Sequence, residues 1–295
     1  MSTTASATSS APRPEDPLAA LASLPGVPEA VDSVRRAVDR VYGHRVMRRR
    51  AGEVTSEAAL RAARGSAALS GADWALEEVR RRSDFGAEAQ ARTVGAALRL
   101  TAEAGQLLSI WRQSPVRVLA RLHLLAAGQA GVPDGPVGRP RLDGEPVAEM
   151  PGAPESDIHG PLTEAPLPGA AEVAGRLDGL SGLILGATEA PALVTAAVVH
   201  GELLALRPFG SYNGLVARAA ERIALVGSGL DPKAICPAEV GHAELGRAVY
   251  AAAFEGYLSG TPAGMARWIA HCGRAVELGV RESTAVCEAL QRGAA

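Results

Sequence analysis

Residues 198–218 read VVHGELLALRPFGSYNGLVAR, and this stretch predicts two helices joined by a tight loop. Over 196–206 the apolar residues recur at three- and four-residue spacing, which is typical of one helix face. Pro208 ends the first helix, because the residue before a proline is disfavoured in the helical region. Asn213-Gly214 is a turn signal. A glycine-bearing loop before a helix N-terminus can bind an anion, although an ordinary helical corner has the same pattern.

The composition predicts a globular protein of one or two domains. The 295 residues are 47% hydrophobic and carry a net charge of −2, so nothing favours binding to nucleic acid or to a membrane surface. No apolar run reaches the ~18 residues that a spanning helix needs, and no signal peptide is visible. The three cysteines have no metal-ligand spacing and are typical of reduced thiols. We therefore expect a cytoplasmic protein, and the abundance of Arg, Ala and Gly is typical of a GC-rich bacterium.

Helical periodicity recurs along most of the chain and predicts an all-α fold. The expected helices cover 28–50, 56–69, 73–82, 86–112, 115–128, 169–185, 190–206, 214–227, 237–258 and 262–291. Residues 131–168 are rich in Pro and Gly and predict a long exposed loop, with a short hairpin within 137–149. We expect a disordered tail over 1–27, a helical arm over 28–56 and a helical domain over 57–291.

The loop after the first helix resembles the signature loop of the Fic (Fido) family, His-Pro-Phe-x-Asp/Glu-Gly-Asn-Gly-Arg-x-x-Arg. Members of that family transfer AMP from ATP to a hydroxyl group of a target protein. Residues 207–218 read RPFGSYNGLVAR, and the matching positions are Pro208, Phe209, Asn213, Gly214 and Arg218. The resemblance implies a Fic-like helical domain with a short flap.

Four positions of the loop depart from the family pattern. Arg207 stands at the catalytic histidine and cannot accept a proton near neutral pH, because its pKa is above ~12. Ser211 replaces the metal-binding carboxylate, and Mg²⁺ prefers charged oxygen ligands. Tyr212 replaces a glycine and should resist positive φ, and Leu215 replaces an arginine that would clamp a phosphate. We therefore assign no catalytic residue, no metal ligand and no strong Mg²⁺ site.

Residues 66–71, SAALSG, resemble the family's inhibitory helix motif, Ser/Thr-x-x-x-Glu-Gly/Asn. Ser66 matches the first position, whereas Ser70 stands where the motif has its glutamate. In the family that glutamate pairs with the arginine replaced here by Leu215, so both partners of one ion pair are absent. Gly71 by itself predicts only a helix C-terminus. If the likeness extends to position, this segment should pack across the signature loop.

Two further segments fit the same resemblance. His200 lies seven residues before Arg207, as a histidine does in the family. We expect it to pack under the loop and bond to backbone, and catalysis by His200 is the alternative. Residues 138–141, GRPR, resemble the start of the family's flap, where a target segment docks by strand addition. The resemblance thus implies a partner protein at 131–168.

The leading hypothesis is a Fic-fold protein that has lost ordinary AMP transfer and binds a phosphate-bearing ligand, such as a nucleotide, or a partner protein. The candidate anion-binding residues are Arg207, Asn213, Gly214 and Arg218, and a surface position is the alternative for Arg218. A transferase with altered chemistry, AMP transfer with an unrecognised base, and a helical scaffold without a ligand remain open.

Overall fold

The computed structural model describes residues 16–86, 88–128, 136–149 and 166–293. The regular elements in these ranges are helices, and the pairing between strands is limited to one isolated parallel bridge between Ala148 and Ser211. The all-α fold class is confirmed. None of the described helices is long and apolar enough to span a membrane.

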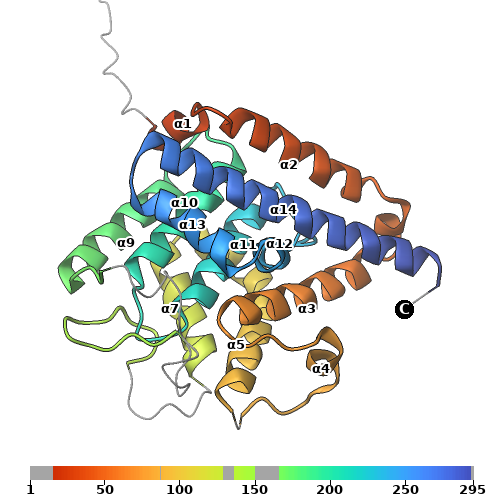
Figure 1. Ribbon diagram of the computed structural model, residues 1–295, viewed down its shortest axis with the longest axis horizontal. Helices are drawn as coiled ribbons and strands as arrows, with labels where there is room; N and C mark the ends of the chain where they lie inside the picture. Colours follow the sequence, from red (N-terminus) through yellow and green to blue (C-terminus); the bar gives the residue numbers. More distant parts are fainter. Residues whose placement is uncertain (1–15, 87, 129–135, 150–165, 294–295) are drawn as a thin grey trace, which may run out of the picture.

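Figure 1 shows the order of the helices along the chain. The first part contains α1 (Pro17–Ala22), α2 (Val27–Tyr42), α3 (Ala51–Leu69), α4 (Leu76–Arg81), α5 (Ala89–Glu103), α6 (Leu108–Trp111) and α7 (Pro115–Ala127). The second part contains α9 (Ala170–Leu185), α10 (Ala192–Leu206), α11 (Asn213–Gly227), α12 (Ala238–Leu245), α13 (Arg247–Leu258) and α14 (Pro262–Gln291). Two short 3-10 turns, η1 (Arg45–Arg48) and η2 (Ala104–Leu107), complete the set.

The helices α10 and α11 form the centre of the molecule. Twelve of the 15 residues of α10 and 13 of the 15 residues of α11 are buried. A helix that is apolar on all sides must be covered on all sides, which explains the position of α10. Around this pair, α2 and α14 run side by side across one edge, and α3, α5 and α7 lie toward the opposite edge (Figure 1). The charged residues of α11 are buried too, so each of them needs a polar or charged partner.

Several predicted helix boundaries are wrong, and the reasons are local. The helix expected over 86–112 is α5, η2 and α6 in succession, and the helix expected over 237–258 breaks into α12 and α13. The second break is at Gly246, where φ is +87°, a backbone angle that favours glycine. The helix expected over 28–50 ends at Tyr42, and α3 begins at Ala51, earlier than expected.

The disordered tail expected over 1–27 is too long, because α1 lies within it. Residues 1–15 lie outside the described part of the chain. The Asp16 side chain caps α1 by accepting from the Leu18 and Ala19 N–H groups at 3.0 and 3.3 Å. A second carboxylate oxygen of Asp16 accepts from the Thr188 hydroxyl at 2.7 Å, which ties α1 to the helical body.

The hairpin expected within 137–149 does not form in the described residues. This segment runs beside the loop that joins α10 to α11. The Arg141 N–H donates to the Pro208 carbonyl at 2.8 Å, and the Ala148 N–H donates to the Gly210 carbonyl at 2.9 Å. Apart from one turn, in which the Glu145 N–H donates to the Leu142 carbonyl at 3.2 Å, the backbone of this segment bonds to the signature loop. Much of the loop expected over 131–168 lies outside the described residues.

Candidate functional site

The loop between α10 and α11 is closed by one side chain. The Asn213 Oδ1 accepts from the Phe209 N–H at 2.9 Å, and the Asn213 Nδ2 donates to the Phe209 carbonyl at 2.8 Å. Both polar groups of this side chain are thus used within the loop. The side chain of Asn213 therefore closes the loop, and anion binding by Asn213 stays a prediction.

Two residues of the loop have a left-handed backbone. Arg207 ends α10 with φ at 41°, and Tyr212 precedes α11 with φ at 55°. The expectation that Tyr212 would resist positive φ is wrong, because it adopts the conformation that a glycine would favour. A single such residue costs about 1–2 kcal/mol. The ring of Tyr212 is completely buried, and burial of an aromatic ring offsets a cost of that size.

The N-terminus of α11 binds the carboxylate of Glu149, the last residue of the described range 136–149. The Gly214 N–H donates to both oxygens of Glu149, at 2.9 and 3.1 Å, and the Ser70 hydroxyl donates to Oε1 at 3.1 Å. Burial raises the pKa of Glu149, whereas Arg218 and the N–H groups of α11 lower it. The contacts of its oxygens are with donors, so the ionised form fits this position. We call Gly214, Ser70 and Arg218 the anion cradle.

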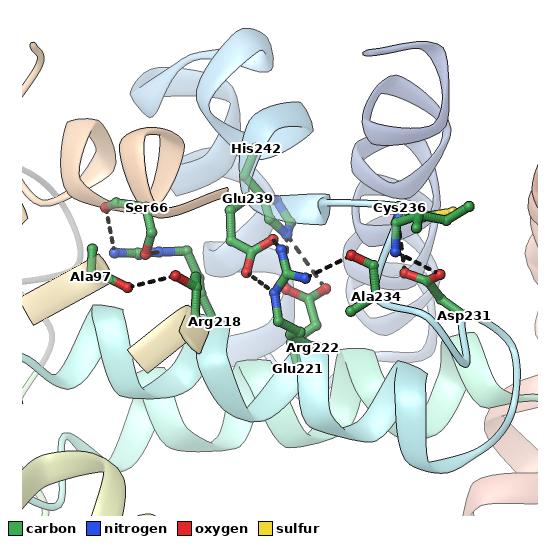
Figure 2. Close-up of polar contacts among 12 residues, drawn as sticks. Ser66, Ala97, Arg218, Glu221, Arg222, Asp231, Ala234, Cys236, Glu239 and His242 are labelled. Carbon is green, nitrogen blue, oxygen red and sulfur yellow. Dashed lines mark hydrogen bonds and ion pairs between the residues drawn. The ribbon is translucent and has the colours of Figure 1, made fainter. Parts of the chain in front are cut away.

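Arg218 connects the cradle to α3. Its Nε donates to the Ser66 hydroxyl at 2.9 Å, and its Nη2 donates to the Ser66 carbonyl at 3.0 Å and to the Ser70 hydroxyl at 2.7 Å. Figure 2 shows Arg218 pointing from α11 toward Ser66. Only 1% of Arg218 is exposed, so the alternative that it is a surface residue is wrong.

The segment that resembles the inhibitory motif packs across the loop, as expected. The helix α3 ends before Gly71, whose φ is +96°, and the Ala72 N–H donates to the Ala67 carbonyl at 2.9 Å. This hydrogen bond is typical of a helix C-terminus closed by glycine. Leu215 is 1% exposed. Ser70 faces Arg218 and Glu149, so a serine hydroxyl stands between an arginine and a carboxylate.

Comparison with known proteins identifies this arrangement of helices. A Fic family protein from Desulfovibrio desulfuricans G20 matches with a TM-score of 0.65 at 18% sequence identity, over 87% of this chain and 74% of that chain. A fragment of Fic-1 from C. elegans matches with a TM-score of 0.61 at 17% identity, over 88% of this chain and 72% of that chain. The chain has the Fic fold. No family model matches the sequence, and no curated protein sequence is similar to it.

Within the Fic fold, Arg207 lies at the end of α10 under a second arginine. Arg141 donates from Nε to the Arg207 carbonyl at 2.9 Å and from Nη2 to the Leu206 carbonyl at 3.3 Å. A cation at the C-terminus of a helix is stabilised by the helix dipole. Arg207 is 8% exposed, and burial and then Arg141 lower its pKa, whereas Glu149 raises it. The Arg207 and Glu149 charges therefore interact across the loop.

A histidine that the sequence analysis did not single out supports the loop from below. His123, on α7, stacks on Phe209 with ring centroids 4.4 Å apart, and its Nε2 lies 3.2 Å from the Ser211 hydroxyl. Its Nδ1 accepts from the Gly138 N–H at 3.0 Å, so Nε2 carries the proton and donates to Ser211. Burial lowers the pKa of His123 to about 4. His123 therefore cannot take a proton from Ser211, and the pair is not a nucleophile and its base.

His200 is fully buried beneath the loop, but its partners are side chains and not the backbone expected from the sequence. Its Nε2 lies 2.6 Å from the Tyr250 hydroxyl, and its Nδ1 lies 3.0 Å from Glu221 Oε2. Burial lowers the pKa of His200, and the Glu221 carboxylate opposes that effect.

Neither Glu149 nor His123 belongs to a sequence pattern that could be connected to the loop, because each comes from a different segment of the chain.

Proposed function

We propose that this Fic-fold protein binds a phosphate-bearing ligand at the anion cradle and does not carry out ordinary AMP transfer. The observation that supports the proposal is the position of the Glu149 carboxylate on the Gly214 N–H group, at 2.9 and 3.1 Å. A carboxylate and a phosphate oxygen accept the same donors, and the N-terminus of a helix favours either anion. The ligand would take the place of Glu149.

The cradle suits a phosphate better than a carboxylate in one respect. A phosphate presents three acceptor oxygens, and the Gly214 N–H and the Ser70 hydroxyl already donate to the carboxylate in this position. The Arg218 guanidinium donates to Ser66 and Ser70, so it adds a positive charge beside the anion. Gly214 has no side chain, and a Cβ at this position would overlap Glu149 Oε1. The close approach of an anion to the backbone therefore requires glycine here.

The residues around the cradle do not support nucleotidyl transfer. Arg207 occupies the position of the expected general base, and His123 beside the loop has both ring nitrogens engaged, with Gly138 and Ser211. Loss of a general base typically lowers a rate by ~10²–10⁴. Ser211 is neutral and bonds to His123, so it offers little to a Mg²⁺ ion.

Calorimetric titration with ATP, GTP and inorganic phosphate tests the proposal. Glu149→Gln keeps the shape of the side chain but removes its charge, and we expect it to bind at least ~10-fold more tightly than the natural sequence, because the competing anion is lost. Gly214→Ala should abolish binding. Glu145→Gln is the matched control, because Glu145 lies in the same segment but pairs with Arg139 at 2.6 Å.

Two results would contradict the proposal. If Glu149→Gln binds none of the three compounds, the cradle is not a phosphate site. If Gly214→Ala binds as well as the natural sequence, the compound binds elsewhere on the molecule.

A protein partner at the flap is the second candidate function. Three exposed apolar side chains beside the loop favour it: Val137 (36% exposed), Leu142 (57%) and Leu167 (45%). Changing Leu142 to Asp should then weaken partner binding and leave phosphate binding unchanged.

A further inference from the structure

Four side chains that can bind a metal ion meet beneath the loop, each from a different helix. They are His200 on α10, Glu221 on α11, His242 on α12 and Cys272 on α14, and none is more than 1% exposed. Their ligand atoms all lie within 4.8 Å of one another. No short sequence motif reveals these four residues, because 20 or more residues separate each of them from the next.

We propose that these four side chains bind one divalent transition-metal ion, most naturally Zn²⁺. The set contains two imidazoles, one thiol and one carboxylate, which are the ligand types of protein zinc sites. Four protein ligands complete a tetrahedral shell and leave no open position. The ion would therefore have a structural role, and it would join four helices at the centre of the fold.

The spacing of the ligand atoms is close to that of a tetrahedral site. The Oε2 atom of Glu221 lies 3.0 Å from His200 Nδ1 and 3.1 Å from His242 Nε2. Around a zinc ion with bonds of about 2.0 Å, such pairs would be about 3.3 Å apart. Small rotations of the side chains would therefore accommodate the ion without movement of the helices. Figure 2 shows Glu221 and His242 facing each other between α11 and α12.

The two histidines are also held in the manner of metal ligands. A histidine that binds a metal through one ring nitrogen normally has a hydrogen-bond partner at the other. His200 uses Nδ1 for the cluster, and its Nε2 lies 2.6 Å from the Tyr250 hydroxyl. His242 uses Nε2 for the cluster, and its Nδ1 lies 3.1 Å from His271 Nε2. Both rings are thereby held with one nitrogen within 3.1 Å of Glu221 Oε2.

A purely hydrogen-bonded network is the competing explanation, and two observations weigh against it. His200 Nδ1 is buried and lies 3.0 Å from Glu221 Oε2, yet it makes no hydrogen bond of good geometry there. In addition, Glu221 is only 1% exposed, and a buried carboxylate needs a cation or proton donors to offset its lost solvation. A Zn²⁺ ion would balance the charges of one carboxylate and one thiolate.

The metal content of the purified, untagged full-length chain tests the proposal. We expect about one zinc ion per chain by elemental analysis. The ion should be lost in Cys272→Ser and in His242→Gln. Cys287→Ser is the matched control, because Cys287 is an equally buried cysteine of the same helix outside the cluster. This variant should keep its zinc.

Cobalt substitution of the natural sequence provides a test that does not depend on folding of a variant. Replacement of Zn²⁺ by Co²⁺ should give strong visible absorption of a tetrahedral site together with a near-ultraviolet band from thiolate to cobalt. The cobalt protein should lose that band on treatment with a strong chelator. Zinc retained by Cys272→Ser, or a chain that takes up neither zinc nor cobalt and whose melting temperature does not respond to them, would overturn the proposal.

Discussion

Buried His123 should make the stability of the fold sensitive to mild acid, and His123→Gln tests this prediction. Burial lowers the pKa of His123 to about 4, from an ordinary value of 6.5. The unfolded chain therefore binds a proton at a higher pH than the folded chain does. Between pH 6.5 and pH 4 the folded chain binds fewer protons than the unfolded chain. The free energy of unfolding therefore falls as the pH decreases through this range. Above pH 7 the contribution is fully present.

The size of the effect follows from the two pKa values. A tenfold difference in proton affinity is worth ~1.4 kcal/mol, so this histidine should remove about 2 kcal/mol of stability by pH 5 and about 3 kcal/mol by pH 4. These values apply to a side chain that is only 1% exposed, so solvent does not screen them appreciably. Glutamine can accept from the Gly138 N–H and remains neutral at every pH, which removes the titration and keeps a hydrogen bond.

Urea unfolding followed by circular dichroism at pH 7 and pH 5 measures the difference. We expect the natural sequence to lose about 2 kcal/mol more than His123→Gln between these two values. Ser211→Ala is the control, because it removes the partner of Nε2 but keeps the titrating ring, and it should retain most of the pH dependence. Equal losses in the natural sequence and in His123→Gln would refute the reasoning.

Three further predictions concern the signature loop, Ser70 and the buried ion pair between Arg222 on α11 and Glu239 on α12. The chain should not label itself or lysate proteins with AMP from ATP and Mg²⁺, and Arg207→His should not restore labelling, which a radiolabel assay checks. Ser70→Glu should lower the free energy of unfolding by about 1–3 kcal/mol, because the new carboxylate would crowd that of Glu149. In a Glu149→Gln background the same change should cost less, and equal costs in a double-mutant cycle would contradict the contact. Arg222→Ala should lower the free energy of unfolding, measured in urea, by about 3–5 kcal/mol. The reason is that the buried Glu239 carboxylate, 2.9 Å from Arg222, would lose its partner. A decrease of less than ~1 kcal/mol would argue against a paired, buried arginine.

The central helices could be predicted from sequence because two independent signals agree there. Apolar residues at helical spacing predict α10, and Pro208 ends it, so that its last helical residue is Leu206. The breaks in longer apolar stretches could not be predicted in the same way. Gly246 separates α12 from α13 through a positive φ, yet a glycine within a helical pattern is often tolerated. Tertiary packing decides between these outcomes.

The candidate site could be predicted only in part, because its key contacts join distant segments. The resemblance of the loop and of 66–71 predicted that the two segments pack together, and the structure joins them. The residue that makes this contact is Arg218, which the resemblance did not pair with Ser66 or Ser70. No local pattern connects Glu149 to Gly214, which lies 65 residues later. The four residues of the proposed zinc site could not be predicted either. The helical period indicates which residues face inward, but it does not indicate which of them meet.

The conformation of the loop itself favours a binding function over a scaffold without a ligand. Arg207 and Tyr212 both keep positive φ, at a cost of about 1–2 kcal/mol each, although neither residue is a glycine. A helical corner with no ligand could relax this cost by ending α10 and starting α11 in ordinary conformations. What the strained loop provides is a Gly214 N–H group directed at the Glu149 carboxylate beside Arg218. The chain fills this position with its own carboxylate, and under the proposed function a phosphate-bearing ligand would displace Glu149 from it.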